Sequence, residues 1–353
     1  MFDLLPPLSP SLLSLARSRQ MRPLSACPDS DIDYYNTFAP IAKLLSFQLI
    51  LAVAAWNGWT ADSFDFNSAY LNSVLDDDKV VFLEQPPNYA KKTPKLFVWH
   101  LHKALYGLKQ GGWKWYEHLC EALADLGVRY AEANWGVFFA RDSEELTILV
   151  IHVGDCLITG SSTPLIQQYK SCIDEKYPMT DGGSISWLLG IKITRNLETG
   201  TLTLSQHAYI DSILARFNFT DLKPLSIPMD PNIILSRSQC PTALTDITCM
   251  RKILYLGEAV RSLMYAAVGM QPDIAFTVAT LAQFLDNPGW PHWEVVKRVF
   301  LVPPWYKNSG TGIWGSQERG WRLHGCRWCL AEIPSCNLRV DFLGWWRGGF
   351  LVF

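Results

Sequence analysis

Two short apolar runs on either side of Gly154 and Asp155 constrain the fold of this chain most. Residues 146–153 and 156–159 are dominated by aliphatic side chains, which favour buried β-strands. A Gly-Asp dipeptide suits a tight turn between two such strands. The pattern therefore predicts an antiparallel hairpin with its turn at Gly154 and Asp155.

The neighbouring segments indicate the fold class. Apolar side chains recur at helical spacing in six of them and form strand-like runs in three others. The expected helices are 41–51 (ending near Asn57 and Gly58), 113–126, 208–217, 259–268, 274–285 and 290–299, and the expected strands are 63–66, 187–194 and 201–205. Because strands and helices mix without a βαβ repeat, the predicted fold class is α+β.

The composition indicates a globular protein. Of its 353 residues, 49% are hydrophobic and 18% are charged, which is enough apolar material for one large or two modest cores. The longest apolar run, 44–56, is too short to cross a bilayer, and the N-terminal stretch lacks the basic region of a secretory signal. Nine irregularly spaced cysteines fit reduced thiols. We therefore expect an intracellular protein without a membrane partner.

A basic segment rich in aromatic residues precedes the hairpin. Between Gln85 and His118, six lysines accompany a single acidic residue, Glu117. Lysines neutralise phosphates and aromatic rings stack on bases, so the segment suits nucleic-acid binding. A solvated basic face with its aromatic side chains in the core explains the same pattern. The net charge of -2 does not decide between them, because nucleic-acid-binding proteins often concentrate positive charge along one path.

Eight short segments follow one another in the order of a known family. They are Asp33-Tyr34-Tyr35-Asn36-Thr37-Phe38-Ala39-Pro40-Ile41-Ala42-Lys43, Phe64-Asp65-Phe66-Asn67-Ser68-Ala69-Tyr70-Leu71, Leu105-Tyr106-Gly107-Leu108-Lys109-Gln110, Ile151-His152-Val153-Gly154-Asp155, Trp187-Leu188-Leu189-Gly190-Ile191, Leu204-Ser205-Gln206, Pro228-Met229-Asp230 and Gln271-Pro272-Asp273-Ile274. Agreement in register over so many segments makes coincidence a poor explanation. The series resembles the reverse transcriptase domain of copia-type retrotransposon Pol polyproteins.

The resemblance implies a reverse-transcriptase-like palm with partial fingers and helical thumb and connection segments. Residues 31–235 would form the fingers and palm, and 236–300 a helical connection segment. Residues 1–30 contain none of these segments and are expected to be a loosely ordered leader from outside the family. Residues 301–353 stand where the family continues toward an RNase H domain, and we expect them to be disordered or misfolded.

The tail has an unusual composition. Eight of the fifteen tryptophans lie between Trp290 and Trp346. This density favours an altered, frame-shifted reading frame in place of RNase H. The alternative is a zinc site, because the Cys-x-x-Cys spacing suits one ion. Its four ligands would be His324, Cys326, Cys329 and Cys336.

The resemblance also locates the polymerase chemistry. Such enzymes hold two metal ions, Mg²⁺ or Mn²⁺, with three aspartates, and the ions activate the primer hydroxyl and neutralise the transferring phosphate. Asp65 and Asp155 match two of these metal ligands, whereas Gly154 stands at the third, which is expected to bridge both ions. His152 replaces a tyrosine and is a softer ligand. Asp62 is expected on the opposite face of the strand from Asp65, too far round to substitute.

Further site residues follow from the same resemblance. An aromatic five residues after the metal-binding aspartate acts as a steric gate against a 2′-hydroxyl, although an aromatic core residue explains that spacing equally well. The residues matching the nucleotide and template site are Phe66, Tyr70 (the gate), Gly107, Lys109 and Gln110. Leu189 and Gly190 match the primer grip, and Trp113 occupies a position that is usually basic.

The leading functional hypothesis is a degenerate retroelement polymerase with little or no activity, in effect a pseudoenzyme. One alternative is a non-catalytic nucleic-acid-binding remnant that uses residues 91–114. The other is a weakly active RNA-directed DNA polymerase, a nucleotidyltransferase. The expected partners are an RNA or DNA primer–template and, if synthesis occurs, a deoxynucleoside triphosphate. The oligomeric state is not predicted.

Overall fold

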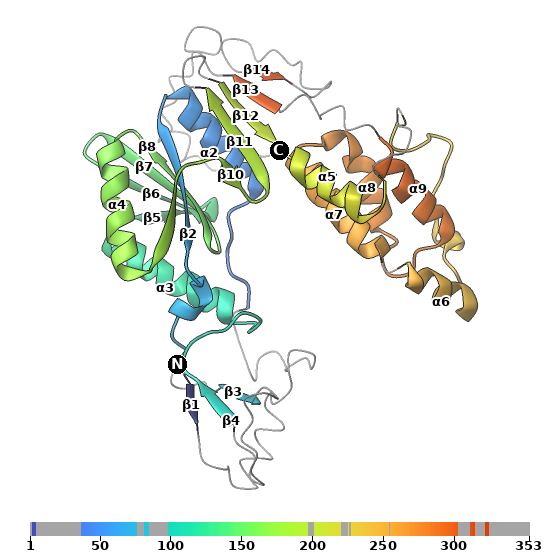
Figure 1. Ribbon diagram of the computed structural model, residues 1–353, viewed down its shortest axis with the longest axis horizontal. Coiled ribbons are helices and arrows are strands. Elements are labelled where there is room, and N and C mark those ends of the chain that lie inside the picture. Colours follow the sequence, from blue (N-terminus) through green and yellow to red (C-terminus); the bar gives the residue numbers. More distant parts are fainter. Residues whose placement is uncertain are drawn as a thin grey trace. The chain divides into compact units, whose positions relative to one another are not determined.

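The computed structural model describes residues 2–4, 37–75, 81–84, 98–196, 201–219, 225, 227–253, 255–302, 311–314 and 322–324. The chain divides into two compact units (Figure 1). The first comprises residues 1–50 and 59–185, and the second comprises 51–58 and 186–353.

A six-stranded antiparallel sheet forms the centre of the first unit. Its strand order is β5-β6-β7-β8-β2-β9. The strands are β2 (Thr60–Phe66), β5 (Arg129–Ala131), β6 (Asn134–Asp142), β7 (Glu145–His152), β8 (Asp155–Gly160) and β9 (Met179–Ser184). The predicted hairpin is confirmed as β7–β8, but its turn lies at Val153 and Gly154, one residue earlier than predicted.

Two helices cover one face of this sheet (Figure 1). Helix α3 (Gly111–Asp125) was predicted, and it presents Trp115, Leu119 and Leu123 at i, i+4 and i+8. Helix α4 (Thr163–Lys176) was not predicted. Together they bury one set of alternating strand residues. That core includes Phe64, Phe66, Phe138, Leu149, Ile151, Cys156, Ile158, Ile166 and Ile173.

Helix α2 (Leu44–Trp56) is present as predicted and is followed by Gly58 in a left-handed conformation (φ 68°). A short 3₁₀ helix, Ala69–Asn72, follows β2. A second, three-stranded sheet has the order β1-β4-β3 and consists of β1 (Phe2–Leu4), β3 (Val81–Glu84) and β4 (Val98–Leu101). Residues Phe2–Leu4 thus form a strand within the expected leader, and residues 5–36 lie outside the described chain.

The second unit contains a five-stranded antiparallel sheet in sequence order. Its strands are β10 (Trp187–Leu188), β11 (Ile191–Asn196), β12 (Thr201–Ser205), β13 (Thr311–Trp314) and β14 (Arg322–His324). The single strand predicted over 187–194 was wrong: a two-residue turn at Leu189 and Gly190 divides it. Both turn residues have positive φ, which reverses the chain within two residues.

Two short segments of the tail therefore form strands, where disorder or misfolding was expected. β13 pairs with β12, and β14 pairs with β13. Of the alternative zinc ligands only His324 is described, at the end of β14; Cys326, Cys329 and Cys336 lie outside the described residues.

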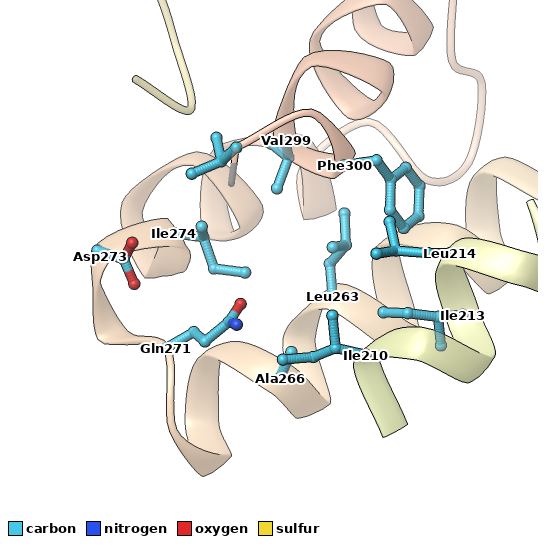
Figure 2. A pocket seen from close by; sticks show the side chains of 11 residues that line it. Ile210, Ile213, Leu214, Leu263, Ala266, Gln271, Asp273, Ile274, Val299 and Phe300 are labelled. Atoms are coloured by element: carbon cyan, nitrogen blue, oxygen red, sulfur yellow. The ribbon is translucent and has the colours of Figure 1, made fainter. Parts of the chain in front are cut away.

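Five α-helices complete the described part of the second unit. They are α5 (His207–Arg216), α6 (Leu244–Lys252), α7 (Tyr255–Gly269), α8 (Ala275–Ala282) and α9 (Trp290–Phe300). All except α6 were predicted. Helices α5, α7, α8 and α9 share an apolar core that lines a small, partly open cavity, shown in Figure 2. The cavity lining is apolar except for Gln271 and Asp273, and burial raises the pKa of Asp273.

The fold class is mixed helix and sheet, as predicted. Within the described residues, none of the helices combines the length and the apolar character needed to span a bilayer.

Candidate active site

Asp65 and Asp155 meet across two paired strands. They are directly opposite each other in the antiparallel β2–β8 ladder, and both are exposed. Their neighbours Phe64, Phe66 and Cys156 point to the other face, into the core beneath α3 and α4. The strand alternation therefore places both carboxylates on the face away from these helices.

Neighbouring elements donate two hydrogen bonds to the hairpin turn between β7 and β8. The indole Nε1 of Trp115 donates to the Val153 carbonyl at 3.0 Å, and the Phe66 N–H donates to the Gly154 carbonyl at 3.1 Å. Val153 has φ 63°, a conformation that is strained for a β-branched residue. Both carbonyls of the turn are thus anchored to neighbouring elements, which fixes where Asp155 begins its strand.

Gly154 lies against the Asp65 carboxylate. A β-carbon built on Gly154 would be 2.7 Å from Asp65 Oδ1. The Asp65 side chain therefore fills the space into which a side chain at 154 would project. Burial, and then the negative charge of Asp155, raise the pKa of Asp65 above its ordinary value.

The donor set fits one divalent ion better than two. A Mg²⁺ ion is commonly held by one or two carboxylates together with substrate phosphates and water. Asp65 and Asp155 can provide the two carboxylates. A second ion needs a further shared carboxylate, and Gly154 has none. Across the part of the chain that the structure describes, no three His, Cys, Asp or Glu side chains gather as a metal site.

Asp62 is committed to a different interaction, on the helix-covered side of the sheet. The Lys170 ammonium on α4 lies 3.1 Å from Asp62 Oδ2 and 2.6 Å from Asp181 Oδ1, and the Lys170 residue is only 3% exposed. Burial alone would raise the pKa of Asp181, but Lys170 and the Gly183 N–H lower it overall. Asp62 thus ties β2 to α4 and is not directed toward Asp155.

The two aromatic residues of the expected nucleotide pocket differ in position. Phe66 is 2% exposed and packs edge-on against Trp115 with ring centroids 5.1 Å apart, so its side chain belongs to the core. A nucleotide bound at this position could contact only the backbone of Phe66, not its side chain. Tyr70 is half-buried, and its ring lies 4.6 Å from that of Tyr106, which is 56% exposed. Tyr70 also packs against the core of the first unit, so its role as a gate stays a prediction.

The loop before α3 carries the other expected nucleotide-site residues. Gly107 has φ 100°, which only glycine adopts readily, and it is the third residue of a turn from Leu105 to Leu108. A second turn, from Leu108 to Gly111, leads into α3. Lys109 is exposed. Trp113, at the usually basic position, lies 6.0 Å from the Tyr116 ring.

The expected primer-grip residues belong to the second unit. Leu189 and Gly190 form the β10–β11 turn, and the Tyr265 hydroxyl on α7 donates to the Leu189 carbonyl. The assignments of Asp65, Asp155, the nucleotide-site residues and this turn to their roles stay predictions.

Sequence reasoning missed three side chains that hold these parts in place: Trp115, Lys170 and Tyr265. Helical periodicity placed Trp115 on a buried face but could not show that its indole reaches the turn. Nothing in the sequence marks Lys170 as buried, since lysines are rarely so.

Comparison with known proteins identifies the family of this chain. Residues 26–231, more than half of the chain, match the family of reverse transcriptases (RNA-dependent DNA polymerases). The chain therefore belongs to the reverse transcriptase family. It is a reverse-transcriptase-like domain of the kind found in Pol polyproteins of copia-type retrotransposons. Domains of this family use divalent metal ions and bind template–primers and deoxynucleotides.

Three curated relatives of this chain are transposon proteins. The chain is 36% identical to the retrovirus-related Pol polyprotein from transposon TNT 1-94 of Nicotiana tabacum, over 80% of this chain and 21% of that protein. It is 35% identical to that from transposon RE1 of Arabidopsis thaliana, over 79% of this chain and 18% of the relative. A putative transposon Ty5-1 protein of Saccharomyces cerevisiae is 29% identical, over 67% of this chain and 73% of that protein. The chain thus spans about a fifth of the first two relatives.

Proposed function

We propose that this chain is a degenerate RNA-directed DNA polymerase domain with little or no DNA synthesis. The observation that carries the proposal is Gly154 beside Asp65: the position that would supply the shared ligand has no side chain, and the Asp65 carboxylate fills its space. Residues 31–235 would form fingers and palm and 236–300 the connection segment. Tyr70 would be the gate, and Leu189 and Gly190 the primer grip.

The expected loss follows from the chemistry of phosphoryl transfer. Charge that develops on the transferring phosphate is neutralised by metal ions held in place by carboxylates. If the missing ligand removes about 4 kcal/mol of transition-state stabilisation, the rate falls about a thousandfold. Mg²⁺ or Mn²⁺ would be held by Asp65 and Asp155 together with substrate phosphates. The remaining residues would still position a primer–template. The protein would act inside the cell.

A primer-extension assay tests this proposal. The unaltered chain is incubated with a labelled primer–template, deoxynucleotides and either Mg²⁺ or Mn²⁺, beside an Asp65→Asn variant. We expect extension by both proteins to be indistinguishable from background. Robust extension by the unaltered chain that Asp65→Asn abolishes would refute the proposal and show that the chain is an active polymerase.

The second candidate function is nucleic-acid binding without catalysis. It is supported by the exposed Tyr106 ring and the exposed Lys109 side chain on one loop before α3. An aromatic ring beside a cation suits a stacked base next to its phosphate. Binding to a primer–template should then weaken as salt rises, and Lys109→Ala should reduce the slope of log Kd against log salt by about 1.

A further inference from the structure

The β10–β11 turn has an unfavourable backbone conformation. Leu189 has φ 49° and Gly190 has φ 76°. Glycine adopts such values freely, but a leucine rarely does, and a strained turn persists only where its surroundings hold it. Leu188 pairs with Ile191 directly outside the turn, so the strain falls on Leu189 alone.

A single tyrosine on α7 holds this turn. The Tyr265 hydroxyl donates to the Leu189 carbonyl, and a β-carbon on Gly190 would lie 3.9 Å from the same oxygen. The Tyr265 ring packs edge-on against Tyr209, with ring centroids 4.8 Å apart. Burial raises the pKa of the Tyr265 hydroxyl, which therefore stays protonated as a donor.

The hairpin that this turn closes presents two exposed side chains to solvent. Trp187 is 48% exposed and lies directly opposite Lys192, which is also exposed. Directly opposed residues share a face of the sheet, so the two side chains project from neighbouring positions on that face. An indole stacks on a nucleobase and an ammonium neutralises a phosphate, which matches the repeating unit of a nucleic-acid strand.

We propose that Tyr265 is a positioning residue for nucleic acid bound by the β10–β11 hairpin. Its hydroxyl keeps the Leu189 turn in place and so determines where Trp187 and Lys192 meet the strand. The partner is a nucleic-acid strand contacted through one base and one phosphate. This inference rests on the proposed function, because it assumes that the chain still binds a primer–template.

Two isosteric variants test the role of Tyr265. Tyr265→Phe deletes the hydroxyl on the turn, whereas Tyr209→Phe deletes a hydroxyl that donates to the Ser262 carbonyl at 3.0 Å. Both variants lose one partly buried hydrogen bond from the same pair of packed rings. In the free protein, amide hydrogen exchange across residues 188–192 should become faster in Tyr265→Phe and stay unchanged in Tyr209→Phe.

Affinity provides the second readout. The Kd for a primer–template, measured by fluorescence anisotropy at fixed salt, should rise about fivefold in Tyr265→Phe, as expected for one lost hydrogen bond. It should not rise in Tyr209→Phe. Lys192→Ala should raise the Kd more when it is made in the unaltered chain than when it is made in the Tyr265→Phe variant. In that variant the displaced hairpin has already moved Lys192 away from the phosphate.

The possible failures are distinct. If the unaltered chain binds but the two tyrosine variants behave alike in exchange and in affinity, the role of Tyr265 is overturned while the proposed function stands. If the unaltered chain does not bind a primer–template, nucleic-acid binding and this inference are both overturned, whatever the exchange data show.

Discussion

Asp65 and Asp155 lie directly opposite each other in the antiparallel pairing of β2 with β8. The two carboxylates come from strands far apart in the sequence, but the strand pairing makes the two residues direct cross-strand partners. With Gly154 completing the hairpin turn beside them, the site keeps two carboxylates and lacks a third. Four tests follow, two from this arrangement and two from buried side chains elsewhere in the chain.

Restoring the missing carboxylate should restore synthesis. In Gly154→Asp the new side chain enters the space now occupied by Asp65 Oδ1, and the Asp65 side chain can rotate because only its terminal oxygen is in the way. We expect single-turnover primer extension with Mg²⁺ to rise at least about tenfold, equivalent to about 1.4 kcal/mol of the barrier.

The matched control for this variant is Gly154→Ala, which adds the same β-carbon without a ligand. It should give no increase in extension. Equal extension by both variants would show that space at 154, and not a carboxylate, limits the reaction.

Asp65 should lower the stability of the folded state as the pH rises from acidic values toward neutral. Its folded-state pKa is raised, so it contributes stability that is present below the unfolded pKa of about 3.8 and lost as the pH rises through the folded value. Asp65→Asn should therefore be more stable than the unaltered chain at pH 7, with no advantage near pH 3. Urea unfolding across this range measures the difference. Asp62→Asn, on the same strand, should instead destabilise, because it removes a partner of Lys170.

The buried ammonium of Lys170 should be important for stability. Lys170→Met leaves the partly buried Asp62 carboxylate and the half-exposed Asp181 carboxylate without their cation, which should cost more than about 1 kcal/mol. Lys176→Met is the control, because Lys176 pairs with Asp125 at the surface, where an ion pair contributes less than about 1 kcal/mol. Equal losses in the free energy of unfolding would contradict the role given to Lys170.

His292 should make the second unit sensitive to acid. The residue is fully buried against Phe284, and its Nδ1 accepts the Gly289 N–H at 2.9 Å. Burial lowers its pKa below 6.5, so the folded state binds fewer protons, and stability is complete above pH 6.5 and falls as the pH drops below it. His292→Asn keeps an acceptor for Gly289 and should flatten urea midpoints between pH 7 and pH 5. An unchanged pH dependence would assign the acid sensitivity to other groups.

Local sequence patterns predicted much of the framework, and distant contacts explain what they missed. The β7–β8 hairpin and α3 follow from apolar runs, helical periodicity and turn residues, which act over a few residues. Helix α4 has a weak apolar face whose buried positions include Lys170, so its periodicity was hidden. β9 is a polar, glycine-containing segment that becomes a strand only because β2 offers a free edge.

The sequence by itself determined the family, the hairpin and the absence of a carboxylate at Gly154, because these depend on residue identity and spacing. Only the tertiary structure decided that Asp65 pairs with Asp155, that Asp62 turns away to Lys170, and that Phe66 lies in the core. Those outcomes depend on which strands pair and which face each helix covers. Such long-range contacts leave no periodic signal along the chain.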